Sequence, residues 1–265
     1  MYVWYYYSDG DDMKVLKYKK VSGSKYSLQL DNGDNIKLYD NTIIYYDLLR
    51  KKDISNLDEV CKYNREIEAY YKSISYLNKK MRTTKEIRKY LEDYPSKTID
   101  NTIERLSKEG YLNDQQYLKV FISNQIGITN NGPYKIVSKL VGLGFDKDEV
   151  LEELENYDRS IFISKLEKLV QKKIDSNTKY SGSHLKEKVL IDMINNGYDK
   201  KDIMDVLNNI SISVDSKILE KEYNKAFKSL SKKYKGNDLE KRILLKLVNK
   251  GFNYNEAKEI ISKGV

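Results

Sequence analysis

The chain opens with short runs in which apolar and polar residues alternate, the period-two pattern of β-strands. This alternation runs through Met13–Lys20, Tyr26–Leu30 and Asn35–Tyr39, and Asp31-Asn32-Gly33-Asp34 separates the last two runs. Asn-Gly between two such runs favours a hairpin turn, because both residues tolerate positive φ. We therefore predict strands over the first 50 or so residues, in a small sheet that needs a third strand or a helix to cover it.

From about Leu57 the apolar spacing becomes helical, and the pattern repeats. The segment Leu140-x3-Gly144-Phe145-x4-Val150-x3-Leu154 recurs over Met193–Leu207 and Leu247–Ile261, and a degenerate first copy covers Tyr94–Ile103. The aromatic residues of the four copies are 51, 53 and 54 residues apart. Each copy predicts a helix that ends at glycine (Asp93 stands in its place in the first copy), then a packed aromatic residue, and then a next helix started by Asp, Ser or Asn.

These patterns predict a mainly α fold. We expect about four tandem three-helix repeats in an elongated, curved array, preceded by a small N-terminal β-hairpin sheet. The expected boundaries are 1–56 for the β segment and 57–112, 113–157, 158–212 and 213–265 for the repeats.

The composition excludes several classes of protein. The chain has 265 residues with a single cysteine and a single histidine, which exclude a disulfide framework, a poly-histidine metal centre and the usual catalytic triads. Cys61 has no general base nearby, His184 has no metal-ligating neighbour, and neither phosphate-binding glycine motif is present. We therefore expect no enzyme activity, no cofactor and no metal.

Membrane insertion is not expected either. No stretch approaches the roughly 20 apolar residues needed to cross a bilayer, and Met1–Tyr7 lacks the basic start of a signal peptide. A cytoplasmic protein is the resulting expectation.

Positive charge is concentrated in two regions of the chain. The net charge is +8 overall, with +4 in residues 61–110, −3 in 111–157 and +6 in 211–265. A polyanionic partner is compatible with this distribution, although a net charge of this size does not establish one.

The sharpest charged pattern is a lysine ribbon after Asp215. Its members step by 4, 4, 3 and 4 residues, which places them within about 80° of a helix circumference and along about 22 Å of its length. Such a ribbon could follow a phosphate backbone without reading sequence, or it could be a solvated helix face. Charge reversal at positions 221, 225 and 228 is expected to weaken binding without unfolding. The ribbon consists of Lys217, Lys221, Lys225, Lys228 and Lys232.

Two smaller groups complete the candidate site. Arg82, Lys85 and Arg88 belong to a basic cluster in the first repeat, where the arginines could hold carboxylate or phosphate. A local role is the alternative, with Thr83 or Thr84 capping a helix and Arg82 in an intramolecular pair. Lys135 and Lys139 are one turn apart on a helix that starts at Pro133, and they are expected to face outward.

Several segments together resemble the bacterial RecX family. Ile74–Leu91 resembles the family's opening repeat, and Glu109–Asp114 resembles its Gly-Tyr-Leu-[DN]-Asp turn. Gly132–Leu140 followed by Gly144 is similar to its Gly-x3-Ile-x3-Leu-x3-Gly segment. The resemblance covers nearly the whole chain, because long Gram-positive members also carry an N-terminal β segment and extra C-terminal helices.

The resemblance implies a regulator of the RecA recombinase in recombination, DNA repair and the SOS response. Family members bind along the groove of the RecA–DNA filament and suppress its ATP hydrolysis and strand exchange. The implied partners are the RecA filament and single- and double-stranded DNA bound non-specifically, and a monomer is expected. The alternatives are a non-specific nucleic-acid-binding repeat protein that acts without recombinase and a purely structural helical scaffold.

Overall fold

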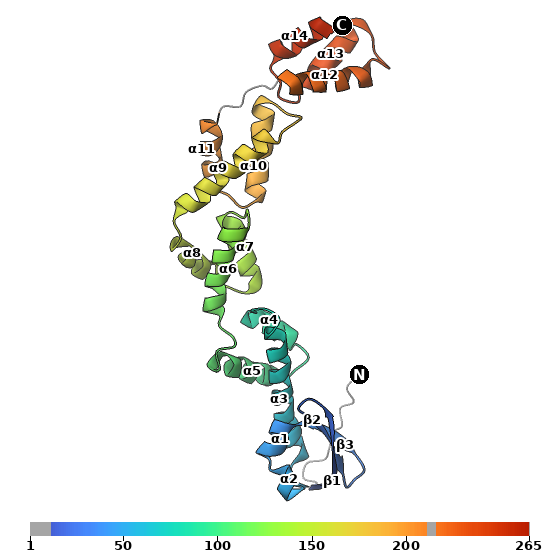
Figure 1. Cartoon of the computed structure of the whole chain (residues 1–265), viewed down its shortest axis with the longest axis vertical. Helices are drawn as coiled ribbons and strands as arrows, with labels where there is room; N and C mark the ends of the chain where they lie inside the picture. Colours follow the sequence, from blue (N-terminus) through green and yellow to red (C-terminus); the bar gives the residue numbers. More distant parts are fainter. Residues whose placement is uncertain (1–11, 211–215, 265) are drawn as a thin grey trace. The chain divides into compact units, whose positions relative to one another are not determined.

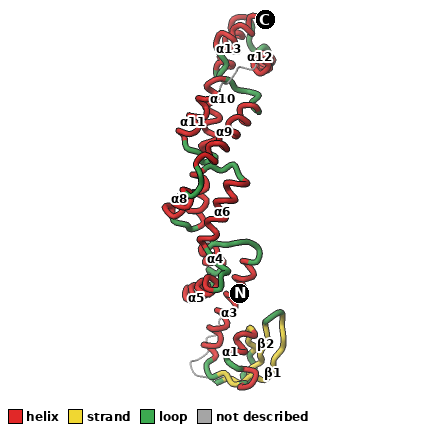
Figure 2. Tube along the Cα trace, turned by 60° about the vertical axis from the view of Figure 1, so that its left-hand side comes forward, coloured by secondary structure: helices red, strands yellow, loops and turns green. Residues whose placement is uncertain are grey.

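A computed structural model describes residues 12–210 and 216–264 of the chain. The expectations above also concern Met1–Tyr7 and Asp215. These residues lie outside the described ones. The chain forms two compact units, residues 1–117 and 118–265. The described part is mostly helical, and Figure 2 shows its strands confined to the first unit. This confirms a mainly α fold with a small N-terminal sheet, whereas the curved array and the repeat boundaries stay predictions.

The N-terminal sheet is antiparallel, with the strand order β3-β2-β1-β4. The predicted hairpin is confirmed, since Leu28 lies opposite Ile36 and Gly33 adopts a φ of 89° in the turn. Leu28, Leu30 and Leu38 fill the core beneath the sheet. The strands are β1 (Met13–Ser22), β2 (Lys25–Leu30), β3 (Asn35–Tyr39) and β4 (Asp53–Ile54).

Residues 40–51 do not form strands, and the prediction of strands up to about residue 50 is wrong there. They form α1 (Asp40–Tyr45) and α2 (Leu48–Lys51). The β-branched and aromatic run Ile43–Tyr46 is typical of a strand. Tertiary packing overrides that preference, because Ile43 is buried under the sheet and the Thr42 hydroxyl donates to Asn64 over 3.0 Å.

Helix α3 (Leu57–Leu77) runs from the sheet to the next group of helices (Figure 1), and its side chains belong to two cores. Its first turns place Leu57 and Val60 beneath the sheet, while Ala69 and Tyr70 pack into the next cluster with α4 (Thr84–Tyr90) and α5 (Ser96–Lys108). The Asn64 side chain accepts from the Tyr39 N–H at 2.8 Å, so the helix also covers the edge of β3.

The remaining helices follow in groups of three. Gly144, Gly197 and Gly251 end the second helix of their groups with φ values of 106°, 85° and 86°, as the repeat pattern predicts. The aromatic residue after each glycine is buried. The helices are α6 (Asp114–Ile128), α7 (Pro133–Leu143), α8 (Lys147–Glu155), α9 (Arg159–Asp175), α10 (Gly182–Asn195), α11 (Lys200–Asn209), α12 (Ser216–Leu230), α13 (Gly236–Val248) and α14 (Tyr254–Gly264).

Within the second unit, one kind of contact joins successive groups. The Gly132 N–H, at the start of α7, donates to the Asn196 carbonyl over 2.7 Å, and the Tyr134 N–H donates to the Gly197 carbonyl over 3.0 Å. The Ser181 N–H, at the start of α10, donates in the same way to the Lys250 carbonyl over 3.0 Å. The start of the second helix in one group therefore binds the glycine-capped end of the second helix in the next. We call these contacts the cap junctions.

Candidate nucleic-acid interface

The lysine ribbon lies on α12, opposite the apolar side of that helix. Leu219, Tyr223 and Ala226 are buried against α13 and α14. The lysines at positions 217, 221, 225 and 228 are all exposed. One part of the prediction needs correction, because α12 ends at Leu230 and Lys232 therefore lies in the turn that follows.

One lysine of the ribbon, Lys225, forms an ion pair with a buried carboxylate. Glu222 is only 2% exposed and binds Lys225 at 2.9 Å and also Lys250, which comes from the end of α13. Burial alone would raise the pKa of Glu222, but hydrogen bonds from Lys250 and Lys225 outweigh it, and the pKa is lowered. The sequence pattern of the ribbon does not indicate this triad, because Lys250 is 28 residues away. No ion pair among the described residues involves Lys221 or Lys228.

More lysines gather where α12 ends. Lys232, Lys233 and Lys235 are exposed in the turn before α13, next to Lys228 on the last helical turn. Cations are favourable there because the carbonyl end of a helix carries partial negative charge. The run Lys232-Lys233-Tyr234-Lys235 carried this signal in the sequence, but sequence reasoning took only Lys232 from it.

The first-repeat cluster is partly occupied by local contacts. Thr83 and Glu86 form a reciprocal capping box at the start of α4. Arg82 lies 2.9 Å from the same glutamate, stacks on the ring of Tyr76 and keeps only 13% of its side chain exposed. Arg82 thus makes the intramolecular pair that the sequence left open as an alternative.

Lys85 and Arg88 remain accessible on α4. Both are exposed, and the Arg88 guanidinium binds Asp100 of α5 at 2.7 Å. An ion pair between two half-exposed side chains contributes little to stability. Arg88 can therefore exchange this partner for a phosphate at small cost.

Lys135 and Lys139 lie on α7 near a cap junction. Lys139 is exposed and its ammonium donates to Gln125 over 3.2 Å. Lys135 is half-buried, and its ammonium donates to the Asn195 carbonyl over 3.2 Å, across the junction with the next group. The side chain of Lys139 thus faces solvent as predicted, whereas Lys135 spans two groups.

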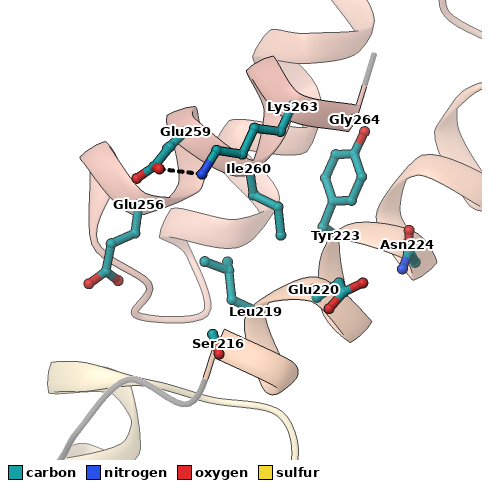
Figure 3. A pocket seen from close by; sticks show the side chains of 10 residues that line it. All are labelled: Ser216, Leu219, Glu220, Tyr223, Asn224, Glu256, Glu259, Ile260, Lys263 and Gly264. Carbon is teal, nitrogen blue, oxygen red and sulfur yellow. Dashed lines mark hydrogen bonds and ion pairs between the residues drawn. The ribbon is translucent and has the colours of Figure 1, made fainter.

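A cleft on the C-terminal group has the wrong charge for phosphate. It measures about 610 Å³ and lies between α12 and α14 (Figure 3). Glu220, Glu256 and Glu259 line it, and Lys263 is bound to Glu259 at 2.5 Å. This lining repels anions, so the cleft is not part of a nucleic-acid interface.

The described residues contain no cluster of three metal-ligating side chains. In the same part of the chain, no helix combines the length and apolar character of a membrane span. Burial raises the pKa of the Cys61 thiol, which disfavours the reactive thiolate. The His184 ring lies 3.6 Å from Glu187 on the same helix.

Comparison with known proteins decides the family. Residues 69–106 match the model of the first three-helix domain of RecX. A curated protein of Streptococcus agalactiae (serotype III, strain NEM316), named "Regulatory protein RecX", is 30% identical over 258 residues, which cover 94% of this chain and 98% of the relative. The chain belongs to the RecX family. A second such protein, from Streptococcus gordonii, is 28% identical over 94% of this chain and 98% of its own length.

A solved structure shares the RecX fold. The crystal structure of a protein titled "regulatory protein RecX" matches with a TM-score of 0.62 and 18% identity, over 74% of this chain and all of that chain. The family model covers Arg82, Lys85 and Arg88 but stops before α7 and α12. The match to the curated RecX relatives covers 94% of this chain, so the similarity extends well beyond the first three-helix domain.

Proposed function

We propose that this RecX protein binds the filament that the RecA recombinase forms on DNA and inhibits its ATP hydrolysis and strand exchange. The protein acts as a regulator in recombination and DNA repair, in the cytoplasm with the chromosome, and catalyses no reaction itself. The observation that carries the proposal is the match to relatives named "Regulatory protein RecX" over 94% of the chain.

The exposed cations support a role for DNA in this binding. Lys221 and Lys228 on α12, and Lys85 and Arg88 on α4, present charge that the fold leaves accessible. Lysine contacts to phosphate bind without sequence preference, which suits a filament assembled on any DNA.

The proposal is tested on DNA-dependent ATP hydrolysis by the cognate RecA. Sub-stoichiometric RecX protein is added to filaments preassembled on single-stranded DNA. We expect the hydrolysis rate to fall at ratios well below one RecX per RecA. Inhibition that appears only when the protein saturates the DNA would contradict the proposal and favour a DNA-binding protein that acts without recombinase.

Two variants test whether the ribbon contributes to the inhibition of ATP hydrolysis. Lys221→Glu with Lys228→Glu should raise the RecX concentration needed for half-inhibition, because both lysines are exposed and outside the Glu222 triad. The matched control reverses Lys241 and Lys246, two exposed lysines on α13 of the same group. Equal loss in both variants would remove the ribbon from the interface.

A further inference from the structure

Two tyrosines and an arginine form a layered stack in the first repeat. Tyr76, near the end of α3, lies parallel to Tyr90, the last residue of α4, with ring centroids 4.2 Å apart and an interplanar angle of 10°. The Arg82 guanidinium carbon lies 3.7 Å from the centroid of the same Tyr76 ring. A guanidinium and a parallel ring at such distances cannot share one face, so Arg82 and Tyr90 cover opposite faces of Tyr76.

Tyr90 is therefore the outer layer of the stack. Tyr76 covers one of its faces, yet 45% of Tyr90 is exposed. Because one face lies against Tyr76, any exposed ring surface of Tyr90 is on the other face or on the ring edge. A hollow of about 470 Å³ adjoins this tyrosine, and Tyr76, Lys89 and Glu92 also line it.

Both signs of charge lie beside the stack, because Lys89 and Glu92 line the hollow together with Glu86. The Glu86 carboxylate, which also lines the hollow, is engaged by Arg82 and by the Thr83 N–H. Lys89 is exposed on the helical turn that carries Tyr90, and the exposed Lys80 lies 3.8 Å from the Glu86 carboxylate. A flat aromatic face beside an exposed ammonium group matches a nucleobase and a neighbouring phosphate.

We propose that Tyr90 stacks an unpaired base of single-stranded DNA, with Lys89 at the adjacent phosphate. The inference deepens the proposed function, on which it rests, by assigning a base-stacking residue to the first repeat. In duplex DNA every base is already stacked and paired, so this contact selects single strands. Stacking needs only a π-face and is indifferent to base identity.

The test measures binding to oligonucleotides without recombinase. Tyr90→Ala should weaken binding of a short single-stranded DNA roughly 5- to 150-fold, the range for the loss of one stacked base. Tyr90→Phe should bind within about twofold of the original protein, because the ring is kept. Tyr111→Ala is the matched control, since it removes another exposed tyrosine, 54% exposed, from the same unit.

Two further readouts separate stacking from a structural effect. The loss in Tyr90→Ala should disappear on an abasic oligonucleotide, and duplex binding should stay unchanged. The fluorescence of an oligonucleotide that carries 2-aminopurine should be quenched by the original protein but not by Tyr90→Leu. The leucine variant keeps an apolar side chain over Tyr76, so it serves if the alanine variant is unstable. Equal binding by the two alanine variants, or an equal loss on abasic DNA, would overturn the proposal.

The RecA assay distinguishes this failure from failure of the proposed function. If Tyr90→Ala binds single strands normally while the original protein still inhibits ATP hydrolysis, only the stacking inference falls. If the original protein does not inhibit ATP hydrolysis by RecA, the proposed function is wrong, regardless of the result for Tyr90→Ala.

Discussion

Glu222 shows how one buried charge can organise a basic surface. Its carboxylate is enclosed between α12 and α13, and the two lysines bound to it come from positions 225 and 250. A carboxylate in such a place is costly without partners and stable with them. The lysines supply the partners, and their stems remain partly in solvent.

The Glu222 triad makes stability depend on acidity. Because the folded-state pKa of Glu222 is lowered, the carboxylate stabilises the fold above its ordinary pKa near 4.3, and this contribution disappears as pH falls through the folded value. Glu222→Gln should cost about 1–3 kcal/mol at pH 7, and the gap to the original protein should narrow as the pH falls below the ordinary pKa of a glutamate. Urea unfolding at pH 7, 5 and 3.5 measures this.

Glu220→Gln is the control, because Glu220 is an exposed neighbour on the same helix. It should change the free energy of unfolding by less than about 0.5 kcal/mol. A gap for Glu222→Gln that stays constant across the three pH values would contradict the assigned role of the carboxylate.

At this scale the sequence indicated local contacts better than distant ones. The Thr83 cap and the Arg82–Glu86 pair span three and four residues, and helix geometry alone suggests them. The Glu222–Lys250 contact joins residues 28 apart, and only the packing of two helices brings them together. The Tyr90 stack also depends on packing between helices. The sequence contains 24 tyrosines, and nothing in it distinguishes Tyr90 from the others.

At the scale of elements, the cap junctions give the repeat glycines a second role. Left-handed φ explains why Gly197 and Gly251 end their helices. Close approach adds a further requirement, because a Cβ on Gly132 would lie 2.5 Å from the Gly197 carbonyl oxygen. Gly132 has a φ of −80°, so the junction and not the backbone conformation excludes a side chain there.

Alanine substitutions can separate these two causes. Gly132→Ala should destabilise the second unit by about 1–3 kcal/mol through overpacking. Gly110→Ala carries only the strain of its φ of 78°, with nothing within 4 Å, and should cost about 1–2 kcal/mol in the first unit. Gly142→Ala, inside α7 with open space around it, should stabilise by about 0.5–1 kcal/mol.

Chemical denaturation of the three variants provides the comparison. If Gly132→Ala were as stable as Gly142→Ala, the junction between α7 and the end of α10 would not form in solution.

The sequence predicted most elements because their signals are local. Alternation and Asn-Gly placed the first three strands within a few residues, and glycine followed by an aromatic residue placed the helix ends. The helices over 40–51 were missed because Ile43–Tyr46 favours a strand and only the sheet core decides otherwise. The cap junctions left no sequence signal beyond the glycines themselves.

At the scale of the whole molecule, charge alternates along the chain. The net charge is +4 over residues 61–110, −3 over 111–157 and +6 over 211–265. A polyanion is therefore expected to contact the first and last repeats more strongly than the acidic one between them. Family resemblance, and not charge, led to the proposed partner, because a surplus of this size does not identify one.

Salt dependence provides a quantitative check of the ribbon. For binding to duplex DNA, each lost phosphate contact should make the slope of log K against log salt shallower by about 0.9. Lys221→Glu with Lys228→Glu should therefore change the slope by up to about 2, while reversal of Lys241 and Lys246 should leave it nearly unchanged. Anisotropy titrations between about 50 and 200 mM salt measure the slope. An equal change in both variants would mean that net charge, and not lysine position, governs binding.

Helix α3 closes the core under the sheet with its first turns and the core of the first repeat with its later ones. If either core were lost, the α3 side chains that fill it would be exposed to water: Leu57 and Val60 under the sheet, or Ala69 and Tyr70 in the first repeat. We therefore expect the sheet and the first repeat to unfold together, because a shortened protein that begins at Leu57 would keep the helix but lose the core that its first turns close. Removal of the β segment should therefore destabilise the first repeat as well, because both pack on α3.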